Sequence, residues 1–360
     1  MINTDQLRFH LARGLPSPRL RATPANYPHR EVKTIILCGR HPNPTMDYYF
    51  TARLMAPGMP PHHILDIDAP NFDNLDPNGA FVIVCRYASP SVLSWIESSA
   101  EQLAGLGLFL DDDISAVIAS RESSLSYKAS LLARGILPLF RLNGRLDIIW
   151  ASTPSLAQSL RYASARILPP APPKHLWDVL KEDGMTERDP KRILMGYHAS
   201  GIHIQEHFFL QPIIQDVLTL RPDVRFEVFT DKKTEHLWRE MDRVQIRRQL
   251  PWKAYLDESA ARRIDIMLVP LSPSHINNCR APTKRVDVAR LGAAGIFSVS
   301  EAYGDQDESG EIRIAYNADV WRETILLLVD DPCRRSNAAA ATRTLVEQMS
   351  QEAEAGLRFW

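Results

Sequence analysis

A cluster of charged and polar residues precedes a short apolar helical pattern in the second half of the chain. Arg280, Thr283 and Lys284 surround Pro282, and Asp287 follows three residues after Lys284. Pro282 suits the first turn of a helix, because the N–H group that it lacks would be unpaired there. The amides and cations at this helix start favour an anion, and the carboxylate favours a sugar diol. The pattern predicts a nucleotide site, and the alternative is an exposed Lys–Asp pair without a ligand.

Three further apolar runs end in residues that can bind ligands. Ligands of open parallel sheets bind outside the carboxyl ends of the strands. A neutral histidine can hydrogen-bond a sugar or phosphate there, and a protonated one can offset diphosphate charge near pH 7. The candidates are Gly39, Arg40 and His41 after the first run, Asp111 and Asp113 after the second, and Gly196, His198, Ser200 and His203 after the third. For the histidines, solvated side chains without a ligand are the alternative.

Apolar runs alternate with helical segments along the chain, which is typical of parallel sheets covered by helices. The nearly continuous apolar character of these runs predicts strands buried on both faces. The predicted strands are 34–39, 80–85, 107–111 and 146–152 in the first half, and 192–196, 225–229, 264–270 and 296–300 in the second. Helices are expected at 203–220, 253–261 and 282–291, and in the C-terminal tail.

The length and one proline-rich stretch predict two domains. At 360 residues the chain exceeds the roughly 250–300 residues at which a single core stops growing. Four prolines fall within 167–173, and a charged stretch follows, so an exposed linker is expected here. We predict Rossmann-like domains over 1–168 and 191–335, a linker at 169–190 and a helical tail at 336–360.

Composition narrows the class of protein. The chain is 45% hydrophobic and 24% charged with a net charge of -1, which gives no electrostatic basis for broad binding to nucleic acid. Its four cysteines are far apart and form no CxxC pair, so neither a zinc site nor a disulfide framework is expected and a reducing cytosol fits. No run approaches the ~18 apolar residues of a membrane span, and the N-terminus does not read as a signal peptide. We therefore predict a cytoplasmic protein that is at most peripheral to the inner face of the membrane.

Several motifs resemble the nucleotide-sugar-binding half of GT-B glycosyltransferases. The matching pieces are "RILMGYHASGIHIQEHF", "RRQLPWKAYLD" and "IDIMLVPLSPSHINNCRAPTKRVDVARLGAAGIFSVS". They are most similar to the bacterial retaining family of glycosyl transferases group 1, which is built like sucrose and mannosyl transferases. More loosely, "NPTMDYYFTARL", "LFLDDDI" and "WASTPSLAQSLR" in the first half look like the same family. The resemblance implies an α/β fold of the GT-B type, with two facing Rossmann-like domains and an interdomain cleft.

The resemblance also has departures at the donor site. Such enzymes often carry two glutamates eight positions apart, the first near the donor sugar and the second at the ribose. Asp287 fits the second, and Cys279 occupies the first. A thiol cannot do the electrostatic work of a carboxylate, so either Asn277, Asn278 and backbone amides hold the sugar or catalysis is impaired. The Arg–Lys pattern common in the first loop of the second domain is replaced by His198, Ser200 and His203.

The resemblance implies transfer of a sugar from a nucleotide diphospho-sugar to a glycan, lipid-linked or other glycoconjugate acceptor, as in polysaccharide biosynthesis. It implies retention, and helix amides and cations would replace a metal, so no metal or other cofactor is expected. The candidate catalytic residues are His41, His198, His203 and Lys284. The candidate donor-binding residues are Gly39, Gly196, Ser200, Asn277, Asn278, Arg280, Thr283, Lys284 and Asp287. Arg40, Asp111 and Asp113 are assigned to the acceptor or the cleft.

Four alternatives stay open at this point. A catalytically impaired GT-B scaffold would bind nucleotide without consuming it, and a sugar-nucleotide epimerase would use the same donor site without an acceptor. An enzyme of the GT-A architecture would hold Mg²⁺ or Mn²⁺ with Asp111 and Asp113. A dinucleotide-dependent oxidoreductase is disfavoured, because no GxGxxG follows the first strand of either domain. The sequence specifies neither the base, sugar and acceptor nor the oligomeric state.

Overall fold

The computed structural model describes residues 14–22, 30–160, 164–179, 192–199 and 203–360. The chain divides into two compact units. Unit 1 comprises Met1–Ala171, Asn278–Ala281 and Glu352–Trp360, and unit 2 comprises Pro172–Asn277 and Pro282–Gln351. The first division falls at the proline-rich stretch, and the chain returns to unit 1 twice.

Unit 1 is built on a parallel sheet with the strand order β2-β1-β3-β4-β5-β6. Its strands are β1 (Thr34–Gly39), β2 (His62–Asp66), β3 (Ala80–Cys85), β4 (Gly105–Leu110), β5 (Ile148–Ala151) and β6 (Arg166–Ile167). Every residue of β3 and β4 is buried, as the continuous apolar runs predict. The helices of this unit are α2 (Pro44–Met46), α3 (Ala52–Leu54), α4 (Pro90–Ser98), α5 (Ile114–Ala119), α6 (Leu125–Leu131), α7 (Leu139–Leu142) and α8 (Pro154–Ser159).

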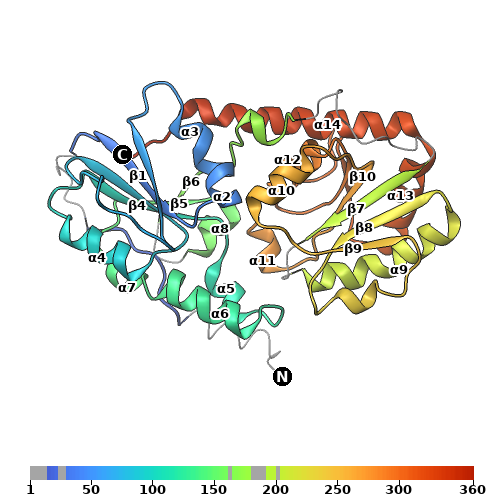
Figure 1. Cartoon of the computed structure of the whole chain (residues 1–360), viewed down its shortest axis with the longest axis horizontal. Coiled ribbons are helices and arrows are strands. Elements are labelled where there is room, and N and C mark those ends of the chain that lie inside the picture. The colour runs from blue at the N-terminus through green and yellow to red at the C-terminus, as the bar shows by residue number, and fades with distance from the viewer. Residues whose placement is uncertain (1–13, 23–29, 161–163, 180–191, 200–202) are drawn as a thin grey trace. The chain divides into compact units, whose positions relative to one another are not determined.

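Unit 2 is built on a second parallel sheet with the order β12-β11-β10-β7-β8-β9. Its strands are β7 (Ile193–His198), β8 (Val224–Phe229), β9 (Val244–Arg247), β10 (Ile266–Val269), β11 (Ala294–Ser298) and β12 (Ile312–Ile314). Its helices are α9 (Ile204–Leu220), α10 (Trp252–Ser259), α11 (His275–Asn278), α12 (Lys284–Arg290), α13 (Ala318–Asp330) and α14 (Pro332–Gln351). Figure 1 shows α9 and α13 on one side of this sheet and α12 with α14 on the other.

Each face of the unit 2 sheet has its own core. On one face, Leu210 and Ile214 of α9 and Trp321 of α13 pack against buried strand residues. On the other, Val288 of α12 packs with Phe297 and other buried side chains. Helix α9 ends just before an Arg–Pro pair, because the residue before a proline disfavours helical backbone. The two cores hold the strand ends of unit 2 in fixed positions.

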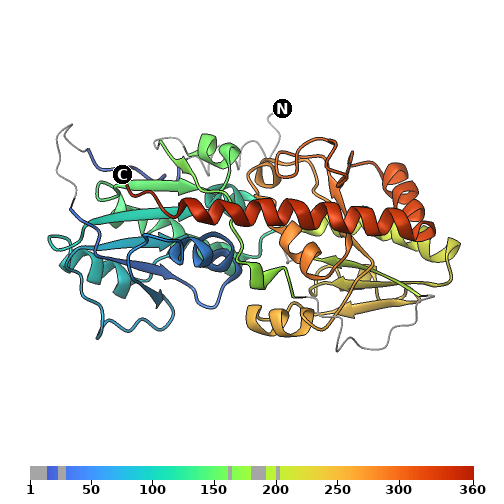
Figure 2. The same cartoon turned by 90° about the horizontal axis from the view of Figure 1, so that it is seen from above.

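Helix α14 is the longest helix of the described chain, and Figure 2 follows it along its length. The chain continues beyond it as Glu352–Trp360, which belongs to unit 1. There the backbone carbonyl of Trp360 accepts a hydrogen bond from Arg166 at 2.9 Å. None of the helices in the described part of the chain has the length and hydropathy that a membrane span requires.

The α/β class predicted from the sequence is confirmed, and each predicted strand corresponds to a strand of the structure. The sequence did not predict β2, β6, β9 and β12. All four lie at the edges of the two sheets, where a strand has a neighbour on one side only. Their residues are largely exposed or half-buried, so their sequences lack the continuous apolar character that identified the central strands.

One expectation about the proline-rich stretch is wrong. Pro170, Ala171 and Pro172 are buried, whereas 167–173 was expected to be exposed. The N–H of Ala171 donates to the carbonyl of Tyr48 at 2.7 Å, and the carbonyl of Pro172 accepts a hydrogen bond from Ser350 at 2.7 Å. Because its polar backbone groups are paired, the stretch can be buried despite its prolines. The charged remainder of the predicted linker, 180–190, lies outside the described residues.

The strand orders identify where ligands would bind in each unit. Ligands of open α/β sheets bind outside the carboxyl ends of the strands, where the strand order reverses. In unit 2 this point lies between β7 and β10, and in unit 1 it lies between β1 and β3. The carboxyl ends of β7 and β1 carry His198 and Gly39, both of which are predicted site residues.

Candidate functional site

His198 lies at the end of β7, in the interior of unit 2. Its side chain is 4% exposed, and its Nε2 atom is 2.9 Å from Oε1 of Glu227. The ring stacks on Phe229 with a centroid separation of 4.0 Å. The neighbouring Gly196 is closely packed, because a Cβ atom there would lie 2.8 Å from Sδ of Met267. The position of His198 is therefore fixed by its contacts with two residues of the neighbouring strand β8.

The ionisation of Glu227 determines the tautomer of His198. Glu227 on β8 is fully buried, and its carboxylate forms ion pairs with Arg247 and Arg262. A carboxylate in an ion pair can only accept hydrogen bonds, so Nε2 of His198 must donate. Burial lowers the pKa of His198 more than Glu227 raises it. His198 is thus a neutral imidazole near pH 7 and carries its proton on Nε2.

Lys284 and Asp287 form a pair at the start of α12. Nζ of Lys284 is 2.8 Å from Oδ2 of Asp287, and the side chains are 38% and 8% exposed, respectively. The charges of both act on His198, which places the three predicted residues in one region of unit 2. The helix begins at Lys284, with Thr283 at its N-terminal boundary, rather than at residue 282 as predicted. Asp287 is largely buried and Lys284 is accessible. The two residues are therefore not the exposed Lys–Asp pair that the sequence left as the alternative to a nucleotide site.

A second polar cluster joins the start of α9 to the loop after β10. Glu206 is 1% exposed, and its Oε1 accepts hydrogen bonds from the backbone N–H of Ser272 and from Nδ2 of Asn277, both at 3.0 Å. Nδ1 of His203 lies 3.6 Å from the other carboxylate oxygen. Asn277 Nδ2 also donates to the carbonyl of Ser272 at 2.9 Å. The amide hydrogens of Asn277 therefore support the loop in this structure, and its predicted contact with the donor sugar stays a prediction.

The pKa of Glu206 leads to a prediction about acid stability. Burial would raise this pKa, but hydrogen bonds and charge from His203 and hydrogen bonds from Ser272 lower it from 4.5 to about 2. A depressed carboxyl pKa stabilises the folded state above pH 4.5, and this contribution is lost as the pH falls from 4.5 to 2. We expect Glu206→Gln to remove on the order of 3 kcal/mol of this pH-dependent stability, at 1.36 kcal/mol per pKa unit.

Urea unfolding of the full chain at pH 7, 4 and 3 measures this effect. The variant should be less stable than the parent at pH 7, and the difference should shrink at pH 3. Asp319→Asn is a matched control, because Asp319 is exposed on the first turn of α13. If the parent and Glu206→Gln lost the same free energy between pH 7 and pH 3, the assignment of acid sensitivity to Glu206 would be wrong.

In unit 1, Arg86 organises the acidic loop after β4. Its Nε atom is 2.8 Å from Oδ1 of Asp111, and its Nη2 atom is 2.9 Å from Oδ2 of Asp112. Thr45 donates a hydrogen bond to Asp111 at 2.8 Å. Arg86 has a φ of 66°, in the left-handed region that few residues other than glycine adopt. Asp113 instead caps α5, where its carboxylate accepts the N–H of Ala116 at 2.9 Å.

Three predicted residues follow one another at the end of β1. Gly39 is buried, whereas Arg40 and His41 are exposed. Nε of Arg40 forms an ion pair with Oδ2 of Asp68 at 3.0 Å. The backbone N–H of His41 lies 3.4 Å from Oδ1 of Asp66. The structure thus leaves the imidazole of His41 accessible at the carboxyl edge of the unit 1 sheet.

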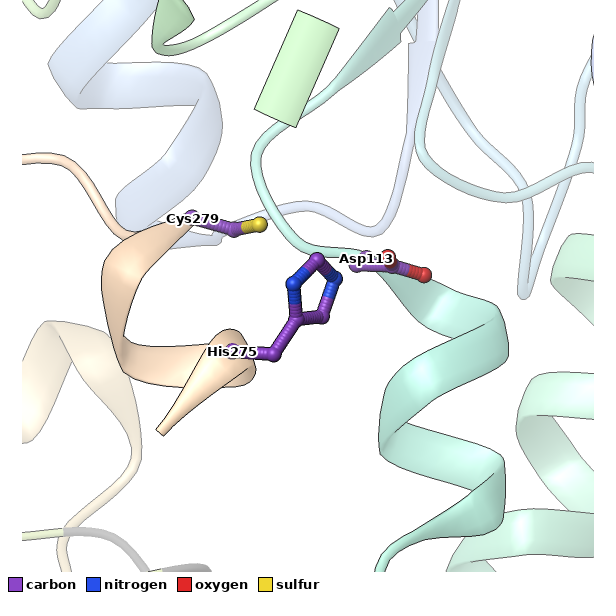
Figure 3. Close-up of side chains that lie close together, drawn as sticks. All are labelled: Asp113, His275 and Cys279. Atoms are coloured by element: carbon purple, nitrogen blue, oxygen red, sulfur yellow. The ribbon is translucent and has the colours of Figure 1, made fainter. Parts of the chain in front are cut away.

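Residues Asn278–Ala281, at the end of α11 and just after it, belong to unit 1 although their flanks belong to unit 2. Asn278 is exposed and Arg280 is half-buried. Cys279 is buried, and its carbonyl accepts a hydrogen bond from the Thr153 hydroxyl at 2.9 Å. Figure 3 shows that Cys279 directly follows α11, that His275 begins this helix, and that Asp113 precedes α5. The predicted donor residue Ser200 lies outside the described residues.

Three residues of these clusters were missed by the sequence analysis. Glu227 is a single carboxylate within the apolar strand sequence "VRFEVF", which is a detectable sign of a buried ionic contact. Arg86 follows the six apolar residues of β3 directly, at a strand end of the kind that the analysis considered. Glu206 gave no comparable sign, because a glutamate in the first turn of a helix is also typical of an exposed position.

The two parallel sheets of the described residues, whose strands alternate with helices along the chain, define an α/β fold of two Rossmann-like units. No family model matches the sequence, and no curated protein is significantly similar to it. Solved structures do match. The α,α-trehalose-phosphate synthase (UDP-forming) from Burkholderia vietnamiensis is 11% identical with a TM-score of 0.54, over 90% of this chain and 98% of that chain.

Two further solved structures have the same fold. A variant of the Thermobaculum terrenum O-GlcNAc transferase is 13% identical with a TM-score of 0.53, over 98% of this chain and 71% of that chain. TarM is 9% identical with a TM-score of 0.51, over 79% of this chain. This chain spans about half of TarM, since the match covers 55% of that chain. These structures are GT-B glycosyltransferases, and the chain has the GT-B fold.

Proposed function

We propose that the chain is a glycosyltransferase that uses a nucleotide diphospho-sugar as its donor. Its acceptor would be a glycan, a lipid-linked sugar or another glycoconjugate. The observation that carries this proposal is the grouping of His198, Lys284 and Asp287 on unit 2. His198 ends β7, where the strand order of this open parallel sheet reverses, and the GT-B fold of the chain supports the same reaction class.

The three side chains would contact different parts of the donor. Lys284 is the accessible cation of the group and would bind the diphosphate. Asp287 would accept hydrogen bonds from the ribose diol, with its charge balanced by Lys284. His198 is neutral, so it would contribute hydrogen bonding rather than positive charge. Thr283 and the backbone at the start of α12 would complete the phosphate contacts.

The chemistry requires stabilisation of the leaving group. Negative charge builds on the diphosphate as the anomeric C–O bond breaks, and prearranged cations lower the energy of that transition state. Lys284 is assigned this role, and Arg280 is the second candidate cation. His203 is proposed to contact the reacting sugar on unit 2, and His41 and Arg40 stay the catalytic and acceptor candidates of unit 1. Retention of the anomeric configuration is part of the proposal and rests on the resemblance to the retaining family.

Ligand-dependent melting of the full chain tests the proposal. A ligand that binds only the folded state raises the melting temperature by mass action. We expect UDP-, GDP- or dTDP-sugars to raise it, and the corresponding diphosphate to be released when an acceptor mixture is added. Binding without consumption would instead indicate a catalytically impaired protein, in keeping with buried Cys279 in place of a carboxylate. An isomerised sugar nucleotide without an acceptor would indicate an epimerase.

We expect nucleotide binding to be independent of divalent metal, because the proposed phosphate ligands are a lysine and backbone amides. Calorimetric titration of the full chain with UDP and GDP, with and without EDTA, should give the same affinity. Loss of all binding on chelation, restored by Mg²⁺ or Mn²⁺, would contradict this proposal. It would favour a metal-held diphosphate at Asp111 and Asp113, as in the GT-A architecture.

A further inference from the structure

Tyr255 of α10 is a buried residue of unit 2 to which the proposed donor contacts assign no role. It is 9% exposed, and its hydroxyl is buried without a hydrogen-bond partner in the described part of the chain. The ring stacks on Trp252 at a centroid separation of 5.8 Å and contacts Phe229 and His198 edge to face at 6.3 and 6.2 Å. These contacts set the position of the hydroxyl oxygen. An unpaired buried hydroxyl costs free energy, which a partner would recover.

Hydrogen bonds join α10 to α12 beside this tyrosine. Nε of Arg290, on α12, donates to Oγ of Ser259 on α10 at 2.6 Å, and Nη2 of the same arginine donates to the carbonyl of Leu256. Leu256 directly follows Tyr255. Asp287 lies about one helical turn before Arg290. The two hydrogen bonds therefore fix the backbone that carries Tyr255 relative to the backbone that carries Asp287.

Asp287 is the charged group that acts most strongly on Tyr255. Burial, and after it the negative charge of Asp287, raises the pKa of Tyr255 well above its usual value, so the hydroxyl keeps its proton near pH 7. A protonated hydroxyl can donate to a carboxylate. In this structure Oδ2 of Asp287 instead lies 2.8 Å from Nζ of Lys284. Asp287 therefore has two neighbours that can donate to it, an accessible lysine and a buried tyrosine.

A diphosphate would compete with Asp287 for Lys284. The proposed function requires Nζ of Lys284 to contact the diphosphate, and a lysine side chain is flexible enough to turn toward it. The Asp287 side chain is only 8% exposed, so it cannot follow the lysine without leaving the interior. A largely buried carboxylate that loses a hydrogen bond is destabilised unless another donor replaces the one that it lost. The hydroxyl of Tyr255 is a donor that is already buried beside Asp287.

We propose that Tyr255 is a positioning residue of the donor site, whose hydroxyl donates to Asp287 when Lys284 turns to the diphosphate. This inference rests on the proposed function and names the residue that holds Asp287 in place during the exchange of partners. The second oxygen of Asp287 is then left for the ribose diol. Tyr255 acts through Asp287 and is assigned no contact with the donor itself.

Tyr255→Phe tests the exchange on the full chain, because it removes the hydroxyl and keeps the ring. Without ligand it should leave the melting temperature of the parent unchanged or raise it, since the hydroxyl has no partner there. In Lys284→Ala, where Asp287 has lost its lysine, the same substitution should lower the melting temperature by about 2–4 °C. In calorimetric titration with UDP, GDP and dTDP, Tyr255→Phe should bind at least about tenfold more weakly than the parent. The corresponding nucleosides should lose less affinity, because they leave Lys284 on Asp287.

Tyr197→Phe is the matched control. It also removes a buried hydroxyl of unit 2, but Tyr197 packs in the core with α9, on the face of the sheet opposite α12. Its effect on the melting temperature should be the same with and without Lys284. If nucleotides bind and Tyr255→Phe also has equal effects in the two backgrounds, the exchange is overturned while the proposed function stands. Unchanged nucleotide affinity in Tyr255→Phe would likewise overturn only the exchange. If none of the three nucleotides binds to the parent, the proposed function fails and this inference fails with it.

Discussion

Lys284→Ala is expected to weaken the binding of nucleoside diphosphates by roughly 1.5–3 kcal/mol, the contribution of a hydrogen bond to a charged group. Nucleoside affinity should change far less, because a nucleoside has no phosphate for the lysine to contact. The variant also leaves Asp287 without its partner at 2.8 Å, which adds repulsion between that carboxylate and the phosphates. Both effects act in the same direction, so the loss should exceed that for any other single surface cation.

Asp287→Asn should show the reverse preference. It removes a charged acceptor for the ribose diol, and it also relieves the repulsion toward the phosphates. Nucleoside affinity should therefore fall by more than diphosphate affinity. Calorimetric titration with UDP, GDP and their nucleosides measures both variants, provided that each still melts near the parent.

Arg239→Ala is the matched control, because Arg239 forms an exposed i,i+4 pair with Glu235 in the same unit. It should leave all affinities unchanged, since exposed pairs contribute only about 0–1 kcal/mol to stability and nothing to a ligand that they do not touch. Unchanged affinities in Lys284→Ala and Asp287→Asn, in a protein that binds nucleotide, would show that the donor site is on another helix.

The largest expected loss of stability follows from Glu311→Ala. Glu311 is fully buried, and its carboxylate accepts hydrogen bonds from Nη2 of Arg285 at 2.6 Å and from Nε of Arg313 at 2.8 Å. Both arginines are also largely buried, at 8% and 6% exposure. Removing the shared carboxylate leaves two buried cations without their main partner, which costs about 3–5 kcal/mol.

Denaturant unfolding of the full chain, followed by tryptophan fluorescence, measures this loss, because Trp321 lies in the core of the same unit. Glu235→Ala is the matched control. Its carboxylate also pairs with two arginines, Arg239 and Arg248, but both of these are more than half exposed. The control should lose no more than about 1 kcal/mol. Equal losses in the two variants would show that burial of the Arg285–Glu311–Arg313 cluster does not determine its contribution.

Much of the fold could be predicted from the sequence because the central strands are buried on both faces. Such strands are continuous apolar runs, and "TIILCG" and "AFVIVC" correspond to β1 and β3 residue for residue. Helix α9 was predicted to within one residue, because its apolar positions and the following Arg–Pro pair mark its extent. The edge strands were missed, since half-exposed strands such as "HHILD" carry polar residues that also suit a loop.

The candidate site was predictable only in part. His198 and the Lys284–Asp287 pair could be selected because strand ends and helix starts are visible in a sequence. The partner that sets the tautomer of His198 could not be selected, because the pairing of Glu227 with His198 depends on the register between β7 and β8. The return of Asn278–Ala281 to unit 1 has no local signal either, since a four-residue segment is placed by tertiary packing alone.

Hydrogen exchange of the full chain, with and without a saturating nucleotide diphospho-sugar, tests the central claim most directly. Exchange reports local opening of the structure residue by residue, so it shows where a ligand binds. Our account predicts slower exchange at residues 283–290 of α12 and at residues 203–207 at the start of α9. A donor that binds but slows exchange only at residues 111–119 of unit 1, with no change in those two segments, would contradict it.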